Sequence, residues 1–421
     1  MLVVGVAAAQ ESWVAGLSAP EARQRVKAVR ELADSDDGFR HLDRLEPLLR
    51  DSSQDVRQAV VLALIKMRTL DAQRLLAKAT ADQSARVQTI AVDGLVDFYV
   101  PGYAKTGAFL SVSAFAASLK ARLSKPTPLT VSGYVQVNPE SVEAIGMVVR
   151  TGRSADARAN AARAVGVLLG REALDALLEG VRSRNSTIIL ESVLAIKKLQ
   201  VPSAGPHLVF LLRDPDPVVR EAVVQTVGQL RTAEAVPSLV DIVEGDGKDS
   251  LRAEALISLA KIPDNGQREL FLRYLVDRNK WLRAAAAEGV GRVRNPEDTR
   301  LVEHHFVLEK AESVKLSLAF AAVNLGNMLR LNHLVQGLNS KVHRLEARPF
   351  LVELARRQAV LDRLYVPLST GSVPQRRHLA YVVSRSGTEA SVAHLEQLTH
   401  DSNGAVANAA IEGLRVLRAR L

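Results

Sequence analysis

The 421-residue chain contains no cysteine, so disulfides, thiolate nucleophiles and cysteine-ligated metals are all excluded. Aromatic residues are scarce: there are two tryptophans, six tyrosines and nine phenylalanines. Glycine and proline are scattered rather than clustered, which is typical of short helices joined by tight turns. No segment contains the ~20 uninterrupted apolar residues that span a bilayer. We therefore expect an all-helical chain without a membrane-spanning segment.

The net charge of +9 is spread over a long chain, at roughly two surplus positive charges per hundred residues. Such a charge density is better evidence for solubility than for nucleic-acid binding. Catalytic patterns are missing as well: the sequence has no phosphate-binding glycine loop and no nucleophile elbow, and its nine histidines show no metal-ligand spacing. We therefore predict no enzyme activity, no cofactor and no metal site.

What the chain does contain is one helix pattern that returns about every 31 residues. It occupies residues 55–67, 156–168, 218–230, 250–262, 281–293 and 405–417. In 218–230 the apolar or small residues fall on one helix face, and their small size allows neighbouring helices to approach closely: Val219, Ala222, Val223, Thr226, Val227 and Leu230. This period predicts a stacked-repeat solenoid.

A second, shorter helix follows each first helix, so the repeating unit is a helical hairpin. Its anchoring leucine recurs every 31 residues at Leu177, Leu208, Leu239, Leu270 and Leu301, and Leu334, Leu364 and Leu395 continue the period with small slips. Pro237 lies where one second helix is expected to begin, a position at which its missing N–H costs nothing.

An acidic residue precedes a basic residue by six positions in several repeats. The pairs are Asp51 and Arg57, Asp214 and Arg220, Asp246 and Arg252, and Asp277 and Arg283, with Glu309 and Lys315 as a variant. We expect the acid to cap free N–H groups in the turn before the first helix, and the arginine to reach the acid of a neighbouring repeat. We interpret these pairs as a structural ladder rather than a charged binding surface.

These acid-to-arginine pairs, the string DPDPVVREA at 214–222 and the paired-helix period resemble the HEAT repeat family, particularly the bacterial HEAT-like repeats of the phycobilisome-lyase type. The resemblance implies an all-α fold, a right-handed α-solenoid of about 12 HEAT-like repeats with a period of ~31 residues and one insertion. It also implies a superhelical scaffold whose second helices line a concave binding face. We expect residues 10–421 to form this single solenoid, closed by a terminal capping helix over 405–420.

Residues 1–9 are interpreted as the remnant of an export signal, because LVVGVAAA places small residues at Ala7–Ala9 after a short apolar stretch. The stretch lacks a positively charged start, so a frayed terminus is the alternative. We favour an exported or periplasmic protein over a cytoplasmic one.

An insertion at 99–138 interrupts the third repeat, where a turn of a few residues would suffice. Residues 111–123 fit an amphipathic helix, and 129–137 alternate like a short strand or hairpin. Aromatic and basic side chains could together bind an acidic peptide, a glycan or a nucleic acid: Tyr99, Tyr103, Lys105, Phe109, Lys120, Arg122, Lys125 and Tyr134. The alternative is that the aromatic residues fasten the insertion to the solenoid.

A second departure from the repeat covers 341–385, which contains nine basic residues and only three acidic ones. The candidate basic patch consists of Arg344, Arg348, Arg356, Arg357, Arg363, Arg376 and Arg377. It could bind a polyanion or a membrane surface, or form a solvated helix face.

Three hypotheses follow. The first is a non-enzymatic scaffold that binds a protein or peptide through its concave face and the 99–138 insertion. The second is binding of nucleic acid or another polyanion through 341–385, which we do not favour. The third is lyase-like activity on tetrapyrrole-bearing proteins. The strict repeats over 156–325 are expected to be structural spacer, and the two departures are the expected functional regions.

Overall fold

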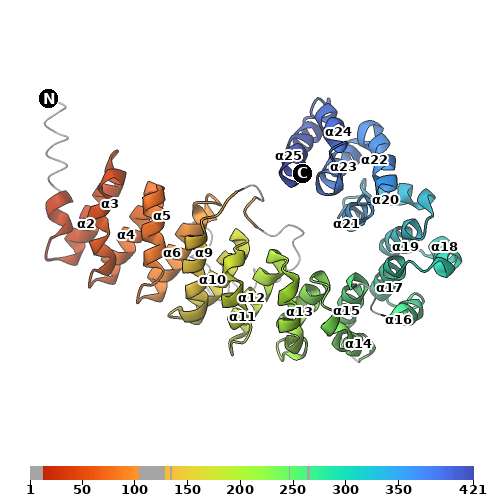
Figure 1. Cartoon of the computed structure of the whole chain (residues 1–421), viewed down its shortest axis with the longest axis horizontal. Helices are drawn as coiled ribbons and strands as arrows, with labels where there is room; N and C mark the ends of the chain where they lie inside the picture. The colour runs from red at the N-terminus through yellow and green to blue at the C-terminus, as the bar shows by residue number, and fades with distance from the viewer. Residues whose placement is uncertain (1–12, 104–128, 133–134, 246, 263–265) are drawn as a thin grey trace. The chain divides into compact units, whose positions relative to one another are not determined.

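The computed structural model describes residues 13–103, 129–132, 135–245, 247–262 and 266–421. Its contacts divide the chain into two compact units. Unit 1 comprises Met1–Leu208 with Asp214–Ala222, and unit 2 comprises Val209–Arg213 with Val223–Leu421. Within each unit the helices stack as successive hairpins (Figure 1). Residues 1–9, the predicted export remnant, lie outside the described residues.

The first helices of the hairpins are the long ones. They are α2 (Ala22–Asp34), α4 (Gln54–Met67), α6 (Ala85–Asp97), α10 (Ala155–Leu168), α12 (Ser186–Leu199), α13 (Pro217–Gln229), α15 (Asp249–Lys261), α17 (Lys280–Val293), α19 (Glu312–Asn324), α21 (Arg344–Leu354), α23 (Val373–Ser386) and α25 (Gly404–Arg420).

Most second helices are shorter, although α9 and α22 have 13 residues each, and many begin with a 3₁₀ turn. They are η1 (Gly38–His41) with α3 (Leu42–Leu45) and η2 (Pro47–Arg50), α5 (Leu70–Ala79), α9 (Pro139–Thr151), η3 (Arg171–Ala173) with α11 (Leu174–Gly180), η4 (Pro202–Ala204) with η5 (Pro206–Arg213), η6 (Ala233–Ala235) with α14 (Val236–Glu244), α16 (Arg268–Tyr274), η7 (Pro296–Asp298) with α18 (Thr299–Leu308), η8 (Met328–Arg330) with α20 (Leu331–Gly337), α22 (Gln358–Thr370) and α24 (Ser391–Leu398).

The all-helical prediction is confirmed, since no strand occurs within the described ranges. The strand predicted over 129–137 is wrong for residues 129–132 and 135–137, which are irregular. Among the described residues only helices lie around this segment, and none offers it a strand to pair with. The N–H of Val131 instead donates to the carbonyl of Val167 at 2.8 Å, one of the last carbonyls of α10, which lack a partner within the helix.

The predicted apolar period agrees closely with the buried core. Leu177, Leu208 and Leu239 are fully buried, and Pro237 lies in the first turn of α14. The prediction is wrong at Leu301, which is 38% exposed, while the adjacent Val302 is fully buried. The hairpin at α18 is shifted by one residue, so the neighbouring valine fills the core position.

Small residues let the first helices touch closely, as predicted. A Cβ at Gly166 would lie 2.8 Å from the Cα of Ala195, and one at Gly291 would lie 2.6 Å from the Cα of Ala321. These distances are shorter than any side chain tolerates, so α10 against α12 and α17 against α19 are in backbone contact.

The regular stacking of first helices changes at α21. Helices α15, α17 and α19 pack extensively side by side, whereas α21 packs less extensively on α19 and also contacts α20 and α23. Helix α21 contains Pro349 in its interior, and proline cannot donate the helical hydrogen bond at that position. This is the region in which the sequence period becomes irregular. No helix of the described part of the chain is long and apolar enough to cross a membrane.

Candidate functional site

The acid-to-arginine pairs connect successive repeats. In unit 1, Arg57 donates from Nε and Nη2 to the carboxylate of Asp82, at 2.7 and 3.1 Å, and from Nη1 to the carbonyl of Asp51 at 2.8 Å. Asp51 in turn accepts two hydrogen bonds from Arg25 and one from the N–H of Ser53. Each arginine therefore holds its own turn and the next one together.

The same arrangement occurs in unit 2, where Arg283 binds Glu309 with two hydrogen bonds and the carbonyl of Asp277 with a third. The hydrogen bond from Arg283 lowers the pKa of Glu309 to about 2. The pattern is not uniform, because Arg252 binds Asp249, the Tyr274 hydroxyl and the Val243 carbonyl instead.

The remaining predicted ladder residues form hydrogen bonds with the backbone, except for one that lies outside the described residues. The carboxylate of Asp214 accepts from the N–H of Asp216, and its carbonyl accepts from Arg220 at 2.6 Å. The carboxylate of Asp277 accepts from the N–H of Asn279. Asp246 lies outside the described residues.

At the insertion, the structure shows how its two ends are joined. The hydroxyl of Tyr99 accepts hydrogen bonds from Nε2 of Gln73 on α5, at 2.5 Å, and from the N–H of Asn138, at 2.8 Å. Asn138 caps α9, the helix that resumes the repeat. Tyr103 is buried. The other candidates fall on residues that the structure does not describe: Lys105, Phe109, Lys120, Arg122, Lys125 and Tyr134. A recognition role for the insertion stays a prediction.

Next to the insertion, polar side chains cross the first helices α6, α10 and α12. The amide of Asn160 donates to the buried carboxylate of Asp93 at 2.9 Å, and Arg163 donates to the buried carboxylate of Glu191 at 2.9 Å. Burial raises the pKa of Asp93 to about 7, against the opposing hydrogen bond from Asn160. Because buried polar groups are costly unless they are paired, this network favours one register of the three helices.

The seven arginines of the predicted basic patch have different environments. Arg376 is a ladder residue, since it forms two hydrogen bonds to Asp401 and one to the carbonyl of Gly371. Arg357 donates to the carbonyl of Val323 at the end of α19. Arg356 and Arg363 are exposed, with no ion pair to any described residue. The charges of the other three, Arg344, Arg348 and Arg377, act on His378.

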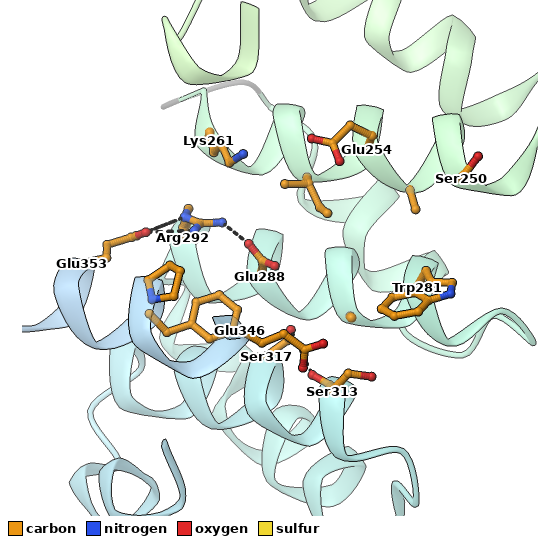
Figure 2. A pocket seen from close by; sticks show the side chains of 15 residues that line it. Ser250, Glu254, Lys261, Trp281, Glu288, Arg292, Ser313, Ser317, Glu346 and Glu353 are labelled. Carbon is orange, nitrogen blue, oxygen red and sulfur yellow. Dashed lines mark hydrogen bonds and ion pairs between the residues drawn. The ribbon is translucent and has the colours of Figure 1, made fainter. Parts of the chain in front are cut away.

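A groove of about 570 Å³ lies on the first helices of unit 2. Helices α15, α17, α19 and α21 line it, with the following residues: Ser250, Ala253, Glu254, Ile257, Lys261, Trp281, Ala284, Glu288, Arg292, Ser313, Ser317, Glu346, Pro349, Phe350 and Glu353. Figure 2 shows Trp281 at one end of this α15–α21 groove and Arg292 with Glu353 at the other. The volume is in the range typical of ligand sites.

A charged triad closes one end of the groove. The guanidinium of Arg292 donates to Glu288 on its own helix at 2.8 Å and to Glu353 of α21 at 2.8 and 3.0 Å (Figure 2). It also lies 4.9 Å from the centroid of the Phe320 ring. Burial alone would lower the pKa of Arg292, but the two carboxylates outweigh it and raise that pKa. The triad therefore fastens α21 to α17.

The groove is formed by first helices, because small residues such as Ala253, Ala284 and Ser317 leave space between them. Three of its four helices, α15, α17 and α19, belong to the strict repeats over 156–325. That second helices line a concave binding face and that the strict repeats are spacer both stay predictions.

Sequence reasoning missed Trp281, Phe350 and the triad as site residues. The spacing of Glu288 and Arg292, four positions apart on one helix face, indicated an ion pair. Nothing in the sequence indicated that Glu353, 61 positions further on, would complete it. That pairing depends on the departure of α21 from the regular stack.

The comparison with protein families identifies the chain. A model described as HEAT repeats matches residues 11–96, 142–228, 195–260 and 236–322, together more than half of the sequence. The chain therefore belongs to the HEAT repeat family. No curated protein sequence matches it significantly.

Solved structures of similar fold are distant in sequence. An Escherichia coli protein, YibA, is 14% identical with a TM-score of 0.41, covering 74% of this chain and 99% of that one. The complex of CpcE and CpcF of phycocyanin lyase from Nostoc is 18% identical with a TM-score of 0.34, covering 69% and 97%. Kap121p is 10% identical with a TM-score of 0.45; the match covers 98% of this chain and 57% of Kap121p.

Proposed function

We propose that this protein is a non-catalytic HEAT-repeat scaffold that binds an extended segment of a partner protein in the α15–α21 groove. The observation that carries the proposal is the lining of this groove, in which exposed aromatic and apolar surface lies beside carboxylates. In the described part of the chain, no group of three or more His, Asp or Glu residues could hold a metal ion.

The apolar part of the lining favours a large side chain on the partner. The Trp281 side chain is 51% exposed at one end of the groove, and α21 contributes Pro349 and Phe350 to the facing wall. A half-exposed tryptophan in a concavity is an energetically favourable contact, since tryptophan is enriched among the residues that dominate binding energies. We expect an aromatic or long aliphatic partner side chain to pack there.

The charges of the lining favour a basic partner. Four glutamates and two basic residues line the groove, and Arg292 is already bound by Glu288 and Glu353. The lining therefore carries two more negative than positive charges. Charge complementarity therefore favours a segment in which a lysine or arginine lies next to the apolar side chain.

Selection from a random peptide library against the full chain tests this function. We expect selected peptides to combine a bulky apolar residue with a basic one, and Trp281→Ala and Glu346→Lys each to weaken binding by about tenfold or more. Glu269→Lys is the matched control, because Glu269 is an exposed glutamate of α16 outside the groove. Enrichment of acidic peptides, or equal losses in Glu269→Lys and Glu346→Lys, would exclude the proposed site.

The insertion over 99–138 is proposed as a second recognition element of the same scaffold. Its support is that Tyr99 and Asn138 hold its two ends together, which gives it a fixed base. Replacing residues 104–128 by a short Gly/Ser linker leaves both of these residues in place. Peptides that bind the wild-type chain and are unaffected by the groove variants should lose binding to this insertion variant. If every selected peptide binds it as tightly as the wild-type chain, the insertion has no role in recognition.

A further inference from the structure

A cluster of arginines lies where α21 and α23 pack against each other. Arg344 and Arg348 are one turn apart on α21, and Arg377 and Arg385 lie on α23. The guanidinium carbon of Arg348 is 4.1 Å from the centroid of the Tyr381 ring, and that of Arg385 is 5.4 Å from the same centroid. Two guanidinium groups from different helices therefore meet at one aromatic ring.

The field of these arginines acts on His378, which is half-buried beside them. Burial, and then the charges of Arg348, Arg344 and Arg377, lower the pKa of His378 to about 4. The imidazole is therefore neutral near pH 7 and can donate one hydrogen bond without adding to the positive charge.

No carboxylate compensates the cluster. Among the described residues, none of the four arginines forms an ion pair, whereas Arg376, next in sequence to Arg377, binds Asp401 with two hydrogen bonds. The acids of α21 are directed elsewhere, because Glu346 contacts His343 and Glu353 binds Arg292. Gathering like charges without a counter-charge is unfavourable, so an anionic ligand would stabilise this arrangement.

Arginine is the side chain best suited to phosphate, because its planar fork can form two parallel hydrogen bonds to phosphate oxygens. We propose that Arg344, Arg348 and Arg377, flanked by Arg385, His378 and Tyr381, form a site for the phosphate monoester of a phosphorylated side chain on the partner protein. This α21–α23 arginine cluster deepens the proposed function and rests on it, since the phosphate would belong to the segment that occupies the groove.

The groove explains why a phosphorylated protein segment is favoured over a nucleic acid. Helix α21 presents Arg344 and Arg348 to the cluster and Glu346 and Glu353 to the groove. A nucleic acid that continued along α21 would place further phosphates against these glutamates. A peptide with one phosphate next to a basic, apolar stretch complements both surfaces.

The test is fluorescence anisotropy with the full chain and a labelled Gly/Ser peptide that carries one phosphoserine and no other charged or apolar residue. We expect it to bind at least about tenfold more tightly than its unphosphorylated form, and Arg344→Gln/Arg348→Gln to remove that difference.

Arg356→Gln/Arg363→Gln is the matched control, with the same loss of charge outside the cluster, and should change binding less than about twofold. Arg377→Lys keeps the charge but loses the fork, and should weaken binding by about three- to tenfold.

Equal binding of the two peptides, or equal losses in the two double variants, would overturn the site. Tighter binding of a 20-nucleotide single strand that depends on Arg344 and Arg348 would replace it with a nucleic-acid site. Because this probe lacks the apolar and basic residues expected in the groove, Trp281→Ala should not affect it. If groove peptides bind and the phosphopeptide does not, this site alone is disproved. If the phosphopeptide binds and no groove peptide does, the proposed function alone is disproved.

Discussion

Two neighbouring arginines of α23 show how the regular and irregular parts of unit 2 differ. Arg376 occupies the ladder position, where its two hydrogen bonds to Asp401 join one repeat to the next. Arg377 is exposed and adds its charge to the field around His378. The arginine in phase with the repeat is therefore used within the stack, whereas its neighbour in sequence is exposed.

The same contrast holds for whole helices. From α15 to α19 the first helices approach so closely that Gly291 admits no side chain. At α21 the close stacking ends, and the space is bounded by Phe350 and by the triad of Arg292, Glu288 and Glu353. We propose that the binding surface of this stack forms where the repetition is interrupted.

The largest expected effect comes from breaking the ladder. Arg283→Ala removes both arginine hydrogen bonds to Glu309 and leaves that carboxylate only the N–H groups of Lys310 and Ala311, so we expect the chain to lose about 2 kcal/mol in unfolding free energy. Arg377→Ala, in the irregular region, should change it by less than about 0.5 kcal/mol. Urea denaturation measures both, and equal effects would remove the distinction between ladder and cluster.

A smaller loss is expected from filling the close helix contact. Gly291→Ala places a methyl group against the backbone of Ala321, which should cost about 1 to 2 kcal/mol even though alanine favours the helix. Gly404→Ala is the matched control, because nothing lies within 4 Å of its Cβ position; it should be neutral or stabilising. Thermal unfolding of both variants decides, and a stabilised Gly291→Ala protein would mean that α17 and α19 are further apart than described.

The smallest effect concerns pH. His378 binds a proton near pH 6.5 in the unfolded chain but only near pH 4 in the folded one, so the stability of α23 should decrease as the pH falls from 6.5 towards 4. For this half-buried group we expect less than about 1 kcal/mol between pH 7 and 5. The pair of Arg283 and Glu309 should persist through that window, because it weakens only as the pH falls from about 4.5 towards 2.

Hydrogen exchange, corrected for the intrinsic pH dependence of exchange, measures this local effect in α23. The variant His378→Asn should abolish the difference between the two pH values in α23 while leaving α17 and α19 unchanged. An identical pH response in wild type and variant would show that His378 titrates normally.

Much of the fold follows from local sequence features. The 31-residue period, the apolar helix face and the turn acids each recur within a few dozen residues. The hairpins, and the helix faces through which they stack, can therefore be inferred from sequence alone. Leu301 shows the limit, since a shift of one residue in the turn before α18 exchanged it with Val302 in the core. Patterns of spacing do not report such a shift.

The site was less predictable for a physical reason. The irregular composition of 341–385 indicated an unusual region, and the charges of three of its seven candidate arginines act on His378. The groove, however, brings Trp281 and Glu254 to residues of α21 that lie 65 to 99 positions later in the sequence. That proximity depends on the packing of α21 against α19 and α20, which no local pattern encodes.

The central claim is that recognition in unit 2 occurs where the regular stack is interrupted at α21. The most direct measurement is photo-cross-linking of a library-selected peptide carrying a benzophenone group to the full chain, followed by mapping of the attachment sites by mass spectrometry. The account predicts attachment to groove residues of α15, α17 and α21, and loss of attachment in Trp281→Ala. Attachment to the second helices α14, α16 and α18, unaffected by Trp281→Ala, would contradict it.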